Sequence, residues 1–414
     1  MTTVLRKLAA ICSVAAACAG SDTPPPPLGA ISTIDAPAGP LSGEPNLAVD
    51  RQGRVYLSWL ERKADSTVAV HLAIREDGQW SAPSTVTARS DLFVNWADFP
   101  SVFVAPSGRV VMHWLQRRPG GRYSYDVITR QSTDGGASWS EPRVLHDDNV
   151  AAEHGFVSFF ATAHDSVEAV WLDGRATAGG SHDSHDQPRG AMQLGSTHVA
   201  ADGSPGATLL IDDRICDCCQ TSAAVTARGP VVVYRDRSPD EIRDIAILRR
   251  VDGKWTEPAR VHADDWHIEG CPVNGPSVVA NGERVVVAWF TGARDTARVN
   301  VAFSSDAGAT FSAPIRVDDG NPAGRVDVEF DGNGGALVTW LERLGDAGAE
   351  VRVRAITTDG TRSPAMVVAN SAAARSSGFP RMVRSGNEIV FAWTQPGDTA
   401  RVRMATAPLA IRQR

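Results

Sequence analysis

The chain has 414 residues, and its composition excludes some partners before any motif is considered. Hydrophobic residues make up 43% and charged residues 21%, as in ordinary globular proteins, and the formal net charge is -7. A protein that binds the phosphate backbone of nucleic acid or an anionic membrane surface is normally basic. We therefore expect no nucleic-acid partner.

The start of the chain has the pattern of an export signal. A basic start precedes an apolar stretch over 8–17, and small residues lead up to Cys18. The apolar stretch is too short to span a bilayer as a helix, and small residues are typical of a cleavage site. We predict a signal peptide at 1–17, a Pro-rich linker at 18–30 and a single domain at 31–414.

The residues around the predicted cleavage point suggest a lipid anchor. The sequence Ala15-Ala16-Ala17-Cys18 resembles the bacterial lipobox, in which the cysteine becomes the lipidated first residue, although Ala15 replaces the usual Leu. The resemblance implies a membrane-anchored lipoprotein, periplasmic or at the cell surface, with Cys18 as the lipidation site. An uncleaved amphipathic anchor is the alternative.

A strand-like run that ends in an aromatic residue recurs along the chain at intervals of roughly fifty to sixty residues. The runs end at Trp59, Trp114, Trp171, Tyr234, Trp289, Trp340 and Trp393. Each run follows a shorter apolar segment and precedes two more, with polar or Gly-containing turns between them. The pattern predicts four strands per repeat and no long helix. Four-stranded units repeated in this way are typical of β-propeller blades.

The aromatic residues predict an all-β propeller of seven four-stranded blades. The last repeat stops after its third strand near Met404, and residues 31–35 read as an unpaired strand. We predict that this N-terminal strand completes the last blade, because closure removes an open sheet edge. Six blades are the alternative, if the long repeat between Trp171 and Tyr234 is irregular.

Two turns between predicted third and fourth strands share one pattern. They read Ser132-Thr-Asp134-Gly-Gly136-Ala-Ser-Trp139 and Ser304-Ser-Asp306-Ala-Gly308-Ala-Thr-Phe311. Both resemble the Asp-box, or BNR repeat, of sialidases and related propellers. The Asp can accept hydrogen bonds from amides of the turn, the Gly can take a positive φ, and the aromatic can pack beneath the hairpin. These residues are therefore expected to be structural.

The resemblance covers most of the chain from about Leu28 and implies an active face opposite the Asp-boxes. Sialidases use three arginines, the first in an R-I-P motif, together with a Tyr–Glu pair and an Asp. Here the first-blade position reads Gly43-Glu-Pro-Asn46, and the nearest imitation is Phe379-Pro-Arg381 in the last repeat. Tyr56 and Tyr234 are expected in the core. The sialidase catalytic motifs are thus not matched, and the resemblance implies either a glycoside hydrolase or a protein that binds a carbohydrate without cleaving it.

Polar residues gather in the loops that enter the innermost strands and in those that join second to third strands. These loops share one face of a propeller, and we predict a carbohydrate site there. Arginines can bind a carboxylated sugar, and a carboxylate can act as acid or base. An ion-pair network that stiffens the loops is the alternative. The catalytic candidates are Asp98, Arg235, Asp236, Arg237, Asp240 and Glu241. The ligand-binding candidates are Trp96, His154, Asp173, Arg175, Gln220, Arg243, His267 and Asn274.

Four cysteines follow the predicted signal and linker: Cys216, Cys218, Cys219 and Cys271. An oxidising compartment favours disulfides, with three possible pairings. Alternatively, Cys216, Cys218 and Cys271, helped by His267, His182 or His185, could hold copper or zinc. A non-catalytic propeller for metal handling or protein interaction is therefore the second functional hypothesis. We expect a monomer.

Overall fold

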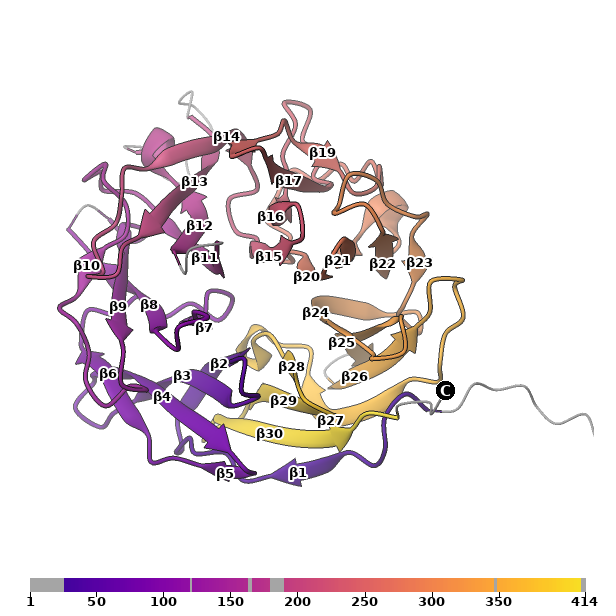
Figure 1. Cartoon of the computed structure of the whole chain (residues 1–414), viewed down its shortest axis with the longest axis horizontal. Helices are drawn as coiled ribbons and strands as arrows, with labels where there is room; N and C mark the ends of the chain where they lie inside the picture. Colours follow the sequence, from indigo (N-terminus) through magenta and orange to yellow (C-terminus); the bar gives the residue numbers. More distant parts are fainter. Residues whose placement is uncertain (1–25, 120, 163–165, 179–189, 346–347, 411–414) are drawn as a thin grey trace, which may run out of the picture.

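The computed structural model of the protein is a ring of seven antiparallel sheets around a central axis (Figure 1). The structure describes residues 26–119, 121–162, 166–178, 190–345 and 348–410. The predicted signal peptide, Cys18, His182 and His185 lie outside these residues.

Within each blade, the strands are given in order from the innermost to the outermost. Blade 1 holds β2 (Ser42–Val49), β3 (Val55–Arg62), β4 (Val68–Glu76), β5 (Gln79–Trp80) and β6 (Ser84–Arg89); blade 2 holds β7 (Val102–Val104), β8 (Val110–Arg117), β9 (Tyr125–Ser132) and β10 (Arg143–Val144). Blade 3 holds β11 (His154–Ala161), β12 (Val167–Asp173), β13 (Met192–Val199) and β14 (Leu209–Ile215); blade 4 holds β15 (Ser222–Thr226), β16 (Gly229–Arg235), β17 (Ile245–Val251), β18 (Lys254–Trp255) and β19 (Ala259–Arg260).

The remaining blades follow the same order. Blade 5 holds β20 (Ser277–Asn281), β21 (Arg284–Thr291), β22 (Arg298–Ser304) and β23 (Ile315–Arg316); blade 6 holds β24 (Pro322–Phe330), β25 (Ala336–Leu344), β26 (Gly348–Ile356) and β27 (Met366–Ala372); blade 7 holds β28 (Arg381–Ser385), β29 (Glu388–Gln395), β30 (Arg401–Pro408) and β1 (Ser32–Ile34). Three short 3-10 turns interrupt the loops: η1 (Arg175–Thr177), η2 (Ala293–Asp295) and η3 (Arg375–Ser377).

The N-terminal strand closes the ring. Ser32 of β1 lies opposite Thr406 of β30, and Ile34 lies opposite Met404. Figure 1 shows β1 alongside β30 at the outer edge of blade 7. The predictions of seven blades and of closure by the N-terminal strand are confirmed, and the six-blade alternative is excluded.

The core consists of apolar layers between neighbouring blades. The repeat aromatics Trp59, Trp171, Trp289 and Trp340 are completely buried. One layer, for example, joins blades 1 and 2 through Tyr56 and Trp114 and another joins blades 4 and 5 through Trp289. Because each sheet covers its apolar faces only with its neighbours, the repeats stabilise one another around the ring.

The two Asp-box turns are held by their carboxylates. Asp134 accepts the Ser138 amide at 2.9 Å and the Ser138 hydroxyl at 2.6 Å, and Asp306 makes the same two contacts with Thr310. Gly136 and Gly308 have φ of 86° and 79°, where glycine is favoured. These hydrogen bonds hold the pKa of each Asp at about 2.

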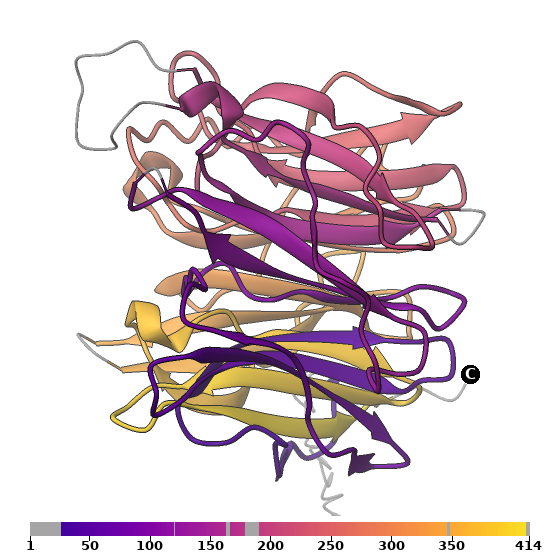
Figure 2. The ribbon, with the colours of Figure 1, turned by 90° about the vertical axis from the view of Figure 1, so that its left-hand side faces the viewer.

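The strands run between two faces of the ring, which Figure 2 shows edge-on. We call the face that carries the loops entering the innermost strands, and the loops joining second to third strands, the top face. The innermost strands are tied across blades, since Asn46 accepts the Val102 amide and Ser277 donates to Asp327 at 2.8 Å. They surround a central cavity of about 360 Å³.

Within the described residues, the structure contains no helix with the length and apolarity needed to cross a membrane.

Candidate functional site

The predicted polar loops meet on the top face, because the ring brings their ends together. Ile215 pairs with Asp236, and Ile242 of the β16–β17 loop pairs with His267 of the loop that enters blade 5. Cysteine, arginine and histidine residues from separate repeats therefore lie next to one another, as the sequence predicts for a closed ring.

Arg235 occupies a buried position between blades 4 and 5. Its guanidinium donates to the carbonyl oxygens of Asn274, Arg243 and Phe290 at 2.6 to 3.0 Å. The guanidinium carbon also lies 4.8 Å from the ring centre of Trp266. With its donors engaged by main-chain carbonyls, Arg235 ties the loops together and is not placed to clamp a ligand.

Arg237 belongs to a more exposed group of charged residues, which we call the arginine cluster. The cluster consists of Asp217, Arg237, Glu241 and Arg243. Arg237 contacts Glu241 at 2.6 Å and Asp217 at 3.3 Å, and its side chain is 23% exposed. Arg243, almost completely buried, contacts the same two carboxylates at 2.8 and 3.4 Å. Burial opposes ionisation of Glu241, but the hydrogen bonds from both arginines outweigh it and lower its pKa. This cluster is an ion-pair network with one solvent-facing guanidinium.

The other catalytic candidates are dispersed. Burial raises the pKa of Asp236 to about 6, and its Oδ1 accepts the Arg237 amide at 2.7 Å. Asp240 and His267 are exposed. Asp98 is buried beneath the top face, where its Oδ2 accepts the Phe156 amide at 2.7 Å.

The loop that enters blade 2 lines part of the central cavity through Ala97, Asp98 and Phe99. Gln220 donates to Ala97 O at 2.7 Å and accepts the Gly275 amide at 2.9 Å. Trp96, which is half-buried, stacks on Phe379 with ring centres 5.8 Å apart. Asn274 is buried and accepts the Arg325 amide at 2.7 Å. Gln220 and Asn274 thus fasten the loops, whereas Trp96 is a partly exposed residue whose ring also contacts the guanidinium of Arg325, with the guanidinium carbon 4.9 Å from the ring centre.

The four cysteines divide into one disulfide and two thiols. Cys218 and Cys271 are bonded, and Cys216 and Cys219 are buried thiols with their sulfurs 2.7 Å apart. Burial opposes ionisation of Cys216, but the hydrogen bond from Cys219 and the charge of Arg243 lower its pKa to about 7. Burial raises the pKa of Cys219 well above its usual value.

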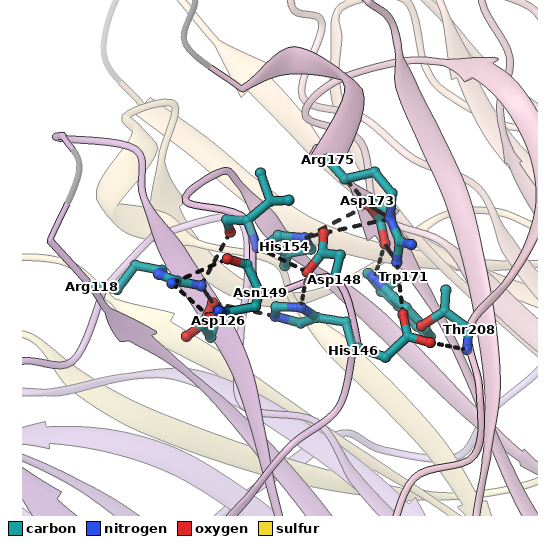
Figure 3. A network of polar contacts seen from close by, with 12 residues as sticks. Arg118, Asp126, His146, Asp148, Asn149, His154, Trp171, Asp173, Arg175 and Thr208 are labelled. Carbon is teal, nitrogen blue, oxygen red and sulfur yellow. Dashed lines mark hydrogen bonds and ion pairs between the residues drawn. The ribbon is translucent and has the colours of Figure 1, made fainter.

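A second polar group joins blades 2 and 3 and contains three of the predicted ligand-binding residues (Figure 3). We call this group the histidine network; it consists of Arg118, Asp126, His146, Asp148, His154, Asp173 and Arg175. The two imidazole rings are stacked with centres 3.7 Å apart. Asp148 bridges them, with Oδ1 2.7 Å from His146 Nδ1 and Oδ2 2.9 Å from His154 Nε2.

The charges of the histidine network are largely compensated internally. Arg175 binds both oxygens of Asp173 at 2.9 Å, and Arg118 lies 3.2 Å from Asp126. Burial opposes protonation of His146, but Asp126 and Asp148 outweigh it and raise its pKa. Hydrogen bonds from both histidines hold the pKa of Asp148 below its usual range despite burial. His and Asp donors of this composition are typical of metal ligands, yet the arginines already supply the positive charge that a cation would bring.

Sequence reasoning identified His154, Asp173 and Arg175 but missed Asp126, His146 and Asp148. A signal was present, because His146 and Asp148 stand in the loop immediately before His154 at the start of an innermost strand. Asp126 is separated from them in sequence and joins the network only because β9 runs beside this loop.

Comparisons with known proteins agree with the architecture. Residues 58–243 match the family description of a BNR repeat-like domain. No curated protein gives a significant match to the chain. The BP39L lectin from Burkholderia pseudomallei is similar over 90% of this chain and 98% of its own, with a TM-score of 0.62 and 10% identity.

Two further solved structures share the fold over most of their length. A protein of unknown function from Dyadobacter fermentans covers 93% of this chain and 98% of its own, with a TM-score of 0.52 and 13% identity. The polysaccharide lyase Uly1 covers 89% and 90%, with a TM-score of 0.52 and 10% identity. Identities this low show a common propeller fold; an activity has to be argued from the residues of the site.

Proposed function

We propose that the protein binds a carbohydrate on its top face, outside the cytoplasm, where the predicted export signal would deliver it. The observation that carries this proposal is the arginine cluster, in which two carboxylates hold the partly exposed guanidinium of Arg237 in place. Nε, Nη1 and Nη2 of Arg237 already donate to Glu241 and Asp217, so a ligand would engage the second N–H of each terminal nitrogen, in a guanidinium that is held in place before binding.

Two further features support a sugar as the ligand. Trp96 is a partly exposed aromatic residue on the same face, and the part of its ring that Phe379 and Arg325 leave uncovered could pack against the apolar side of a sugar ring. The fold is also shared with a protein named as a lectin and with one named as a polysaccharide lyase.

Asp236 is partly exposed and burial raises its pKa to about 6, whereas Glu241 and Asp98 are poorly suited to act as the acid of a hydrolase. A glycosidase needs a protonated carboxyl group that reaches the scissile oxygen. The arginines keep Glu241 ionised, whereas Asp98, with its pKa raised to about 7 by burial, is enclosed beneath the surface. The accessible acid that cleavage requires is therefore not supplied by these two candidates.

The test is a glycan-binding screen that includes uronic acids and sialylated sugars, followed by calorimetry on the best ligand. Arg237→Ala should weaken binding about tenfold or more, because one charged hydrogen-bonding group is lost. Arg228→Ala is the matched control, since Arg228 forms a similar 2.8 Å ion pair with Glu283 in the turns of the opposite face.

Two results would count against the proposal. Absence of binding to every glycan would exclude it, and equal affinity of the Arg237→Ala protein would move the site elsewhere. Release of reducing ends from any bound glycan would instead show that the protein cleaves it, as a hydrolase or as a lyase.

A further inference from the structure

Three sulfur atoms lie together on the top face, and one of them is held in a disulfide. We call Cys216, Cys218 and Cys219 the sulfur cluster. Their sulfurs all lie within 4.8 Å of one another. Cys218 is bonded to Cys271, which enters from the loop before blade 5 with a Cα–Cα distance of 6.1 Å. The bond occupies one of three clustered sulfurs and leaves the other two as thiols.

The cluster has an outer, accessible side and an inner, protected side. Cys271 is exposed and Cys218 is half-buried, whereas Cys216 and Cys219 are each only 1% exposed. A soluble reductant can therefore reach the disulfide before it reaches the thiols behind it.

Two arginine side chains lie close to the buried thiols of the cluster. Arg243 Nη1 lies 3.5 Å from the sulfur of Cys216, and the charge of Arg235 acts on both buried thiols. Three thiolates and one monovalent cation carry a net charge of about -2 by simple valence counting. Arg243 also pairs with Asp217 and Glu241, so the guanidinium groups offset only part of this charge.

We propose that reduction of the Cys218–Cys271 disulfide converts the sulfur cluster into a three-thiolate site for monovalent copper. A dithiol reductant supplies two electrons and two protons, the bond between the two sulfurs breaks to give two thiols, and the reductant becomes a disulfide. Copper(I) then displaces the protons of Cys216, Cys218 and Cys219. In the oxidised protein, the disulfide therefore prevents Cys218 from binding the metal.

The chemistry of the donors selects the cation. Thiolates are soft ligands that favour copper(I) and zinc, and structural zinc sites are almost always four-coordinate. Reduction also frees the thiol of Cys271, but among the described residues only the sulfurs of Cys216, Cys218 and Cys219 form a group within 4.8 Å of one another, and three donors suit a trigonal copper(I) ion. Metal–sulfur bonds of about 2.3 Å place the sulfurs roughly 4 Å apart, so the Cys216–Cys219 pair has to open by about 1 Å.

Two serine variants test the proposal, because both remove the disulfide and only one removes a metal ligand. Cys271→Ser leaves all three cluster sulfurs free, and Cys218→Ser leaves two. Each protein is titrated anaerobically with copper(I) against a chromophoric chelator, and copper–thiolate charge-transfer absorption is recorded. We expect Cys271→Ser to bind one equivalent without reductant, and Cys218→Ser to bind about 100-fold more weakly.

The unmutated protein provides a second measurement that does not depend on either variant folding. After reduction with a phosphine and desalting it should bind one equivalent, and in its oxidised form it should bind as weakly as Cys218→Ser. Equal binding by the two variants, or by the two redox forms, would overturn the proposal. So would zero free thiols in the denatured oxidised chain without residues 1–26, which lacks Cys12 and Cys18, because Cys216 and Cys219 would then be bonded to each other.

Discussion

Burial in the propeller gives individual carboxyl groups unusual ionisation, and Asp98 shows the effect most clearly. Its neighbour His113 lies 4.0 Å from Asp98 Oδ1, but burial lowers the pKa of His113 to about 3, so the imidazole is neutral. No positive charge from His113 therefore offsets burial, which raises the pKa of Asp98 to about 7. The amide of Phe156 is the partner that fixes its orientation.

Asp98→Asn should remove part of the pH dependence of stability. The pKa of Asp98 rises from an ordinary 3.8 to about 7 on folding, so its contribution is fully present below pH 4 and is lost as the pH rises through 7. The asparagine does not titrate and can still accept the Phe156 amide. Between pH 4 and pH 8, chemical unfolding should show that the free energy of unfolding of the wild type falls by about 3 kcal/mol relative to that of the variant.

The exposed Asp240→Asn is the control for this measurement, since its carboxyl group is on the same face but in solvent. If the difference in unfolding free energy between the wild type and Asp98→Asn does not change with pH, Asp98 is ionised in the folded protein.

Sequence predicted the location of several polar residues better than their roles. Arg235 ends strand β16, and strand periodicity places its side chain on the same face as Val231 and Val233, which are buried against blade 5. That alternation was available in the sequence and indicates a buried arginine. The three carbonyls that satisfy it come from two loops and from strand β21, and these partners could not be identified without the packing of blades 4 and 5.

At the scale of elements, the histidine network fastens the loops of blade 2 to the start of β11. Asp148 is the central residue, because its two oxygens hold both stacked imidazoles while its side chain is only 5% exposed. Removing its carboxylate leaves the two buried imidazole rings without the hydrogen-bond acceptor that they share.

Asp148→Ala should lower the free energy of unfolding by about 3 kcal/mol, as expected for one partner of a buried charged group. Because the pKa of His146 is raised in the folded protein, its contribution to stability is present below about pH 6.5 and is lost at higher pH. Because the pKa of Asp148 is lowered, its contribution to stability is present above about pH 3.8 and is lost in acid. The loss should therefore be largest between those values. Chemical unfolding at pH 5 and pH 9 checks the size of the loss and its decrease at high pH, and a measurement at pH 3 checks its decrease in acid.

Asp147→Ala serves as the adjacent control. Asp147 is 48% exposed, so its contacts with Thr208 and Arg175 are worth about 1 kcal/mol or less. Equal losses for the two variants would mean that the bridge between the histidines contributes nothing of its own.

The second strands could be predicted from sequence because they are buried on both faces, as Val110–Arg117 and Arg284–Thr291 show. The outermost strands were less predictable. β10 and β23 have two residues each and are largely exposed, so apolar alternation hardly marks them. Their positions depend on hydrogen bonds to the third strand rather than on a core of their own.

At the scale of the whole molecule, the ring needs both ends of the chain. β1 covers the outer edge of β30, and Leu28, which is 1% exposed, packs into the layer between blades 6 and 7. The sequence predicted this closure because the count of strands left one unpaired segment at each end. Which cavity or cluster the ring would form at its centre could not be predicted, since it depends on how far each loop reaches across the axis.

Removing residues 1–36 should destabilise the protein by about 3 kcal/mol or more and should promote association, because it deletes Leu28 and exposes the edge of β30. Thermal unfolding and size-exclusion chromatography over a range of concentrations measure the two effects. A chain that lacks residues 1–26 keeps β1 and Leu28 and should stay stable and monomeric.

Leu28→Ala in the full chain separates the two causes. This variant should lose about 2 to 4 kcal/mol from the apolar layer, yet it should remain monomeric because β1 still covers β30. If it associates as readily as the chain without residues 1–36, the exposed edge is not the cause of association. If the chain without residues 1–36 is as stable as the chain without residues 1–26, three strands are sufficient for blade 7 and closure by β1 adds no stability.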